Sequence, residues 1–242
     1  MMSLAQAAAT ATTTAGLLAG GCAYAAMWPQ SQLFGRVVLA GSNPNQIALT
    51  YDDGPNDIAT ERLLEVLARH EVRATFFMIG SFVRQRPQIA RAVAAAGHLI
   101  GNHTETHPWL PWQSAARIRE ELLACNRALE DTLGVPVHYM RPPHGARRPA
   151  VLRIARELGL TTVNWNIIAG DWKPQPAAAI FNTLQRGIAH NRRRGRGTNI
   201  VLHDGGHTGL GQPRLPTVEA TDMLLQSLDR SKFRLVTPEV WG

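Results

Sequence analysis

The sequence contains few cysteines: Cys22 and Cys125 are the two thiols among 242 residues. Two thiols cannot build the framework of several disulfides that stabilises small secreted domains. Cys22 also lies in an atypical N-terminal segment, so we expect no structural disulfide inside the folded domain. Cys125 is flanked by Leu122, Leu123 and Leu129, which predicts a buried core thiol.

Charged side chains are absent from residues 1–35, and the first one is Arg36. The stretch Leu4–Met27 is rich in Ala, Thr and Gly and is about long enough to span a bilayer. It fits an uncleaved anchor or a signal peptide, although the basic residues that normally open a signal are missing. We expect export to the periplasm or cell envelope, or membrane anchoring, with a cytoplasmic enzyme as the alternative. The run Leu18–Cys22 loosely resembles a lipoprotein cleavage site, and lipidation of Cys22 is the less favoured interpretation.

Acidic residues are outnumbered, with 18 Asp and Glu against 25 Lys and Arg, which gives a formal charge of +7. A basic protein suits anionic partners such as nucleic acid, acidic lipid or an acidic wall polymer. The densest basic cluster, at residues 192–196, has no aromatic residues between its arginines. We therefore interpret it as a solvated loop and expect no nucleic-acid partner. Nothing in the sequence implies a protein partner.

Strand-like and helix-like runs alternate from about residue 45 onward. The expected strands are Gln46–Tyr51, Ala74–Ile79, His98–Ile100, Val137–Met140, Thr161–Trp165, Asn199–Leu202 and Phe233–Val236. The expected helices are Thr60–His70, Phe82–Ala96, Ser114–Leu133, Pro149–Leu158, Ala177–His190 and Thr217–Leu228. This alternation predicts an α/β fold with parallel strands and outer helices, either a barrel or a doubly wound sheet. Polar residues follow several of the strands, at the end where such folds place their functional sites.

Two adjacent carboxylates, Asp52 and Asp53, follow the apolar run Ile47–Tyr51 and precede Gly54 and Pro55. Buried carboxylates repel each other unless a cation or a proton separates their roles. In a turn, neighbouring side chains can converge on one point. One carboxylate can then bind a metal while the other acts on a water molecule.

His103 and His107 are separated by four residues, so on a helical turn they would share a face and could bind one metal. Glu105, between them, would then point away. Two neutral imidazoles and one carboxylate form a common ligand set of catalytic metal sites. Together with the two aspartates, this spacing predicts a metal centre.

His203 follows another buried strand, where an imidazole is suited to proton transfer or serves as a structural histidine. Asp171 could orient that ring and raise its pKa by charge pairing, or cap a turn. Arg141 precedes two prolines and is presented rigidly, either to a catalytic carboxylate or in a structural salt bridge. The backbone around Gly145 could stabilise an oxyanion. We interpret His207, a further imidazole near this site, as incidental.

The ordered set of motifs resembles the polysaccharide deacetylases with a NodB-type domain, known as carbohydrate esterase family 4. The resemblance runs from about Gln46 to Val240. It rests on five segments: Thr50–Pro55, His103–His107, Arg141–Gly145, Asp171–Trp172 and Leu202–His203. The resemblance implies a distorted (β/α) barrel of about seven strands at residues 41–242, preceded by an N-terminal apolar segment at residues 1–40.

The resemblance also implies roles for individual residues. Asp53, His103 and His107 would bind a divalent metal, usually zinc, with Co²⁺ or another transition metal as alternatives. Asp52 would be the base, supported by Arg141, and His203 the acid, oriented by Asp171. The substrate pocket would include Tyr51, Pro143, His144, Trp172 and Leu202. Two of these positions depart from the family, which commonly has Phe at Tyr51 and Tyr at His144.

The expected function is removal of N-acetyl groups from glycans that contain N-acetylglucosamine, such as peptidoglycan, chitooligosaccharide or an exopolysaccharide. One alternative is a related deformylase or amidohydrolase that acts on a small or lipid-linked substrate. Another is a glycan-binding domain that has lost catalysis. The presence of both Asp52 and His203 argues against a pure binding domain, because binding alone requires neither an acid nor a base.

Overall fold

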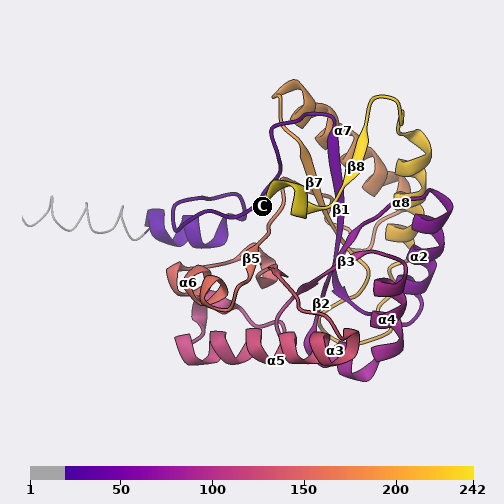
Figure 1. The fold of residues 1–242 in the computed structure, drawn as a ribbon. Coiled ribbons are helices and arrows are strands. Elements are labelled where there is room, and N and C mark those ends of the chain that lie inside the picture. Colours follow the sequence, from indigo (N-terminus) through magenta and orange to yellow (C-terminus); the bar gives the residue numbers. More distant parts are fainter. Residues whose placement is uncertain (1–19) are drawn as a thin grey trace, which may run out of the picture.

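The computed structural model describes residues 20–242, so most of the predicted anchor or signal segment lies outside the described residues. The described part is built on one curled sheet of eight strands, and each pairing within it is parallel (Figure 1). The strand order is β5-β4-β3-β2-β1-β7-β6, and β8 pairs with the first half of β1. No pairing joins β5 to β6 in this range, so the barrel is open there. This architecture confirms the predicted distorted (β/α) barrel.

The central strand β1 spans Gln46–Gly54 and is buried along nearly its whole length. A continuous apolar run is expected for a parallel strand that is covered on both faces. The other strands are β2 (Thr75–Met78), β3 (Leu99–Asn102), β4 (Tyr139–Met140), β5 (Thr161–Thr162), β6 (Ile167–Ile168), β7 (Thr198–His203) and β8 (Arg234–Val236). The prediction missed β6, because two residues are too few to form a periodic pattern.

Helices surround the sheet, as expected for parallel strands joined by crossovers (Figure 1). They are α2 (Ala59–Arg69), α3 (Gly80–Gln85), α4 (Pro87–Ala95), α5 (Ala115–Leu133), α6 (Pro149–Glu157), α7 (Ala177–Arg193) and α8 (Leu215–Ser227). The single helix predicted over residues 82–96 is wrong. Pro87 has no N–H and disfavours helical backbone at Arg86, so the chain breaks there into α3 and α4.

Cys125 lies on α5 within the main hydrophobic core and is fully buried, which confirms the predicted core thiol. Cys22 is exposed, and neither cysteine forms a disulfide. Helix α5 begins where the Ser114 hydroxyl accepts a hydrogen bond from the backbone N–H of Arg117. It ends at Gly134, whose φ of 72° places the backbone in the left-handed region that favours glycine.

The segment 26–31 packs against the loop that follows β4. The buried guanidinium of Arg147 donates hydrogen bonds to the carbonyl oxygens of Trp28, Ser31 and Gly145. This part of the N-terminal extension is therefore integrated into the folded domain. Among residues 20–242, no helix has the length and apolar character needed to cross a bilayer. Export or anchoring stays a prediction.

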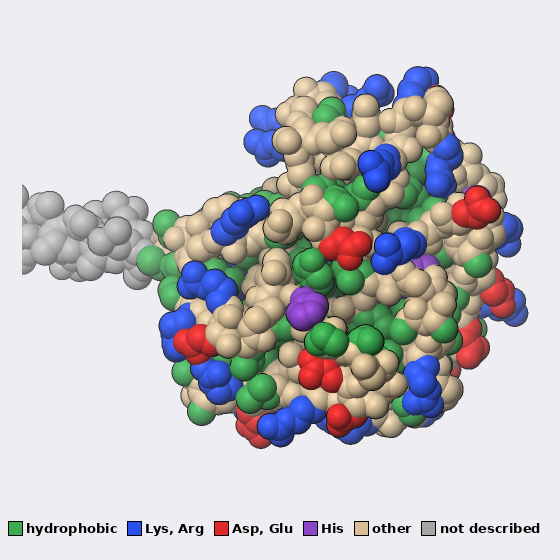
Figure 2. All heavy atoms as spheres, viewed as in Figure 1, with side chains coloured by type: hydrophobic (Ala, Val, Ile, Leu, Met, Phe, Trp, Pro, Cys, Tyr) green, Lys and Arg blue, Asp and Glu red, His purple; other side chains and the backbone are tan. Residues whose placement is uncertain are grey.

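The basic residues do not form one continuous surface on the face in Figure 2, where Lys and Arg side chains alternate with acidic ones. The arginine cluster at residues 192–196 lies at the end of α7 and is mostly exposed. This distribution agrees with a solvated loop. The absence of a nucleic-acid partner stays a prediction.

Candidate active site

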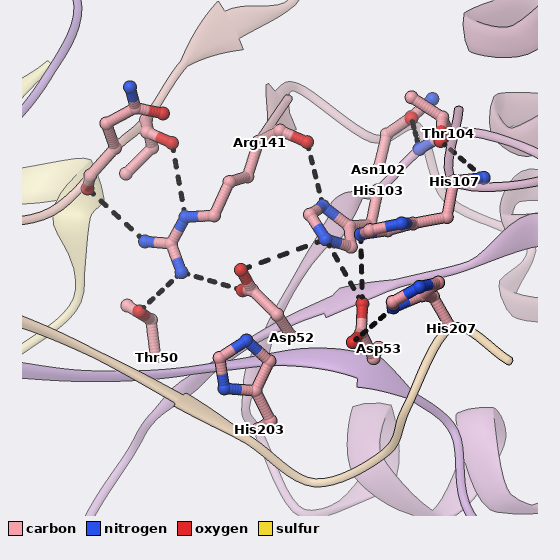
Figure 3. A network of polar contacts seen from close by, with 12 residues as sticks. Thr50, Asp52, Asp53, Asn102, His103, Thr104, His107, Arg141, His203 and His207 are labelled. Carbon is pink, nitrogen blue, oxygen red and sulfur yellow. Dashed lines mark hydrogen bonds and ion pairs between the residues drawn. The ribbon is translucent and has the colours of Figure 1, made fainter. Parts of the chain in front are cut away.

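A bulge at the end of β1 brings the two adjacent carboxylates together. In a regular strand, Asp52 and Asp53 would point to opposite faces of the sheet. The pairing register with β2 shifts between Asp52 and Gly54, and Asp53 adopts a φ of 70°. Aspartate tolerates this left-handed conformation better than most residues do. As a result both carboxylates point toward His103 (Figure 3).

His103 and His107 lie in a loop after β3 and not on a helical turn, so that part of the prediction is wrong. The side-chain oxygen of Asn102 accepts a hydrogen bond from the Thr104 N–H at 2.7 Å. The Thr104 hydroxyl in turn accepts one from the His107 N–H at 3.0 Å. These local bonds compete with helix formation and fold the loop so that both rings still face the same point. Glu105 turns away from them and pairs with Arg84.

The distances from Asp53 to two histidines match the requirements of one zinc ion. Asp53 Oδ1 lies 3.4 Å from His103 Nε2 and 3.3 Å from His107 Nε2. Two ligands of one tetrahedral zinc, each about 2.0–2.1 Å from it, lie roughly 3.3 Å apart. Asp53 Oδ1 is buried and has no hydrogen-bond partner, as expected for an atom reserved for a metal. These residues therefore fit the metal that the sequence predicts.

The protonation states also suit metal binding. His103 Nδ1 donates a hydrogen bond to the Arg141 carbonyl at 2.8 Å, which leaves Nε2 with a free lone pair. Burial lowers the pKa of His107 to about 2, so this ring is neutral. Burial acts to raise the pKa of Asp53, yet that pKa lies well below its ordinary value, so the carboxylate is ionised.

The structure also brings His207 to this centre, although the sequence analysis assigned it no role. One donor atom each from Asp53, His107 and His207 lies within 4.8 Å of the other two. His207 Nδ1 is 3.9 Å from Asp53 Oδ2. The imidazoles of His207 and His107 lie nearly parallel, with their centroids 4.5 Å apart.

Asp52 is paired with a fully buried arginine. Arg141 Nη1 donates hydrogen bonds to Asp52 Oδ1 and to the Thr50 hydroxyl, both at 2.7 Å. The remaining nitrogens of the guanidinium donate to the carbonyl oxygens of Val163 and Asn164 (Figure 3). All three nitrogens of the guanidinium are therefore engaged. The rigid cation thus holds the Asp52 carboxylate in place beside Asp53.

His203 and Asp171 form a second polar pair across the site. His203 Nδ1 lies 2.9 Å from Asp171 Oδ1, and the His203 backbone N–H donates to Asp171 Oδ2 at 2.7 Å. The Thr217 hydroxyl donates to the same oxygen at 2.9 Å. Burial lowers the pKa of His203, but the charge and hydrogen bond of Asp171 outweigh it and raise that pKa to about 9. His203 is therefore protonated at neutral pH and can act as an acid.

These groups open into a cavity of about 460 Å³ whose walls include His144 and Trp172, as predicted. Tyr51, Pro143 and Leu202 are not among the residues that line it, and their place in the substrate pocket stays a prediction. The alternation of side chains along a strand turns Tyr51 and Leu202 toward the opposite face, where both are buried in the core.

Three hydrophobic side chains that the sequence analysis missed contribute to the wall instead: Trp165, Ile168 and Val201. Val201 precedes His203 by two residues on β7 and therefore shares its face. Strand alternation alone could have identified it. Ile168 lies in the short strand β6 and Trp165 lies just before it. The sequence gives no clear pattern for this strand.

Comparisons with known proteins agree with this geometry. A family model described as polysaccharide deacetylase matches residues 40–163. The chain is 34% identical over 202 residues to a chitooligosaccharide deacetylase of Bradyrhizobium sp. (strain ANU 289), which covers 80% of this chain and 89% of that protein. The fold matches the crystal structure of the Bc1960 peptidoglycan N-acetylglucosamine deacetylase with a TM-score of 0.75 and 30% identity, over 82% of this chain and 89% of that one.

The chain therefore belongs to the polysaccharide deacetylase family. This confirms the predicted family and the predicted class of enzyme, a polysaccharide N-deacetylase. The chain is also similar to BA3943 of Bacillus anthracis, a pseudoenzyme of carbohydrate esterase family 4. That match has a TM-score of 0.74 and 26% identity, over 84% of this chain and 67% of the other.

Proposed function

We propose that this protein is a zinc-dependent hydrolase that removes N-acetyl groups from glycans containing N-acetylglucosamine. The main support is the arrangement of three groups around one cavity. Asp53 lies at zinc-ligand spacing from both His103 and His107, Asp52 is paired with Arg141, and the protonated His203 is paired with Asp171. Metal site, base and acid are thus present in one pocket.

Amide hydrolysis requires an activated water, a stabilised oxyanion and a proton for the leaving nitrogen. A zinc ion bound here would lower the pKa of a water molecule and polarise the acetyl carbonyl. Asp52 acts as the base that removes the proton from the attacking water. Arg141 fixes Asp52 Oδ1, so Oδ2, which lies 3.8 Å from His103 Nε2, faces the metal centre.

His203 supplies the proton that the leaving nitrogen needs. Its Nδ1 is bonded to Asp171, so its Nε2 is the nitrogen available to the substrate. The backbone N–H of Gly145 donates to the Pro142 carbonyl and is therefore occupied. The neighbouring N–H of His144, at the cavity wall, is the candidate donor to the oxyanion.

Aromatic side chains at the rim support a saccharide substrate. Trp172 is 42% exposed at the cavity, and its ring is steeply inclined to that of His203. Trp109 is 40% exposed and stacks on His144 at a centroid distance of 3.8 Å. Flat aromatic faces provide the apolar contact that pyranose rings require, and His144 and Trp172 border the reacting centre.

The direct test is acetate release by purified protein supplied with zinc, with chitooligosaccharides and peptidoglycan compared as substrates. We expect acetate from at least one of them and a stoichiometric gain of free amino groups. Formate release from N-formyl sugars, with no acetate, would instead favour a deformylase. Glycan binding without release of acetate or formate from any of these substrates would indicate a glycan-binding domain that has lost catalysis.

A further inference from the structure

His207 lies in the loop between β7 and α8, which is rich in glycine: Gly205, Gly206, Gly209 and Gly211. Its side chain is 49% exposed, whereas those of Asp53, His103 and His107 are almost completely buried. The loop nevertheless brings the imidazole beside Asp53, where its Nδ1 faces Asp53 Oδ2 (Figure 3).

The two carboxylate oxygens of Asp53 face different imidazoles. Oδ1 faces His103 and His107, at 3.4 and 3.3 Å, and Oδ2 faces His207 Nδ1 at 3.9 Å. Two ligands about 2.0–2.1 Å from the same zinc lie at most about 4.1 Å apart. The His207 distance exceeds the roughly 3.3 Å between two tetrahedral ligands but stays below this limit, so Nδ1 must move closer to share the ion.

We infer that His207 is a fourth protein ligand of the zinc ion held by Asp53, His103 and His107. This inference rests on the metal dependence of the proposed function. The His207 ring lies nearly parallel to that of His107, so it must tilt to direct its Nδ1 lone pair at the same ion. The glycine-rich loop permits this movement, because glycine restricts the backbone least.

A fourth protein ligand has a clear chemical consequence. Catalytic zinc sites usually have three protein ligands and an open position, and zinc can expand to five ligands. His207 would tighten zinc binding in the enzyme without substrate. Because it is half exposed on a loop, it is also the one ligand of the four that can withdraw without disturbing the core.

His144 provides a matched comparison. Its imidazole also contacts His107, at a centroid distance of 4.8 Å, but in an edge-on arrangement. Its own stacking partner is Trp109, and no Asp53 oxygen lies within ion-pair distance of it. Loss of His144 removes an imidazole from the same cavity without removing a donor from the metal centre.

The test compares zinc affinity in His207→Ala, His144→Ala and the wild-type protein, by competition with a chelator of known affinity. We expect His207→Ala to weaken zinc binding at least about tenfold, a loss on the scale seen when groups that hold metals are removed. His144→Ala should stay within about twofold of the wild type. The Co²⁺-loaded proteins are compared by visible absorption, which reports the number and kind of ligands. Only His207→Ala should change that spectrum.

Equal zinc affinity in the two variants would overturn the inference. So would a weakened affinity with an unchanged Co²⁺ spectrum, because His207 would then act through Asp53 and not as a ligand. His207→Asn, measured in the same way, and near-ultraviolet circular dichroism exclude misfolding as the cause of any loss. If the wild type releases acetate but His207→Ala binds zinc as tightly as the wild type, this inference alone is overturned. Zinc binding through His207 without acetate release would overturn the proposed function alone.

Discussion

Replacement of Asp171 by Asn should move the pH dependence of catalysis in a predictable direction. The Asp171 carboxylate, by charge and hydrogen bond, outweighs burial and raises the pKa of His203 from an ordinary 6.5 to about 9. Without that charge the pKa should return to about 6.5 or lower, a change of roughly 3 kcal/mol in the free energy of protonation. At pH 8 the protonated fraction of His203 would then fall from about nine-tenths to about one-thirtieth.

Because the acid must be protonated to act, turnover is present below the pKa of His203 and is lost as the pH rises through it. The kcat for acetate release, measured from about pH 5.5 to 9.5, should therefore show its basic limb near 9 in the wild type and at least about two units lower in Asp171→Asn. Asp222→Asn is the matched control. Asp222 Oδ1 lies 2.6 Å from His70 Nε2, and this second Asp–His pair does not line the cavity. A basic limb at the same pH in wild type and Asp171→Asn would refute the reasoning.

Two stability predictions follow from buried arginines. Arg141→Met removes one partner of a buried ion pair and leaves Asp52 without its cation, so the free energy of unfolding should fall by about 3–5 kcal/mol in denaturant titrations of the metal-free protein. A loss below about 1 kcal/mol would contradict a buried ion pair between Arg141 and Asp52. Arg147→Met removes the donors to the Trp28 and Ser31 carbonyls, so stability should fall by about 2 kcal/mol and limited proteolysis should cleave near residues 26–31. An unchanged cleavage pattern would contradict the role given to Arg147.

The sequence predicts the order of the motifs, and that order is enough to identify the family and the barrel. The long, strongly patterned elements were predicted almost to their ends; α5, for example, has a serine cap and a glycine stop. The errors fall where local patterns are short or conflict. Strand β6 has two residues, and Pro87 divides a continuous helical pattern.

The site shows the limits of prediction more sharply. The convergence of Asp52 and Asp53 depends on a bulge at Asp53, which no local pattern in the sequence announces. Hydrogen bonds to the side chains of Asn102 and Thr104 fold the loop that brings His103 and His107 together, although their spacing suggested a helix. His207 reaches the metal centre through loop geometry alone, so no spacing rule could place it there.

The central claim is that the adjacent carboxylates have different tasks, with Asp53 binding the metal and Asp52 acting as the base. The most direct measurement combines zinc content and acetate release in Asp52→Asn and Asp53→Asn. The account predicts that Asp52→Asn retains nearly normal zinc and releases no acetate, whereas Asp53→Asn loses the zinc. Equal zinc loss in both variants, or substantial acetate release by Asp52→Asn, would contradict it.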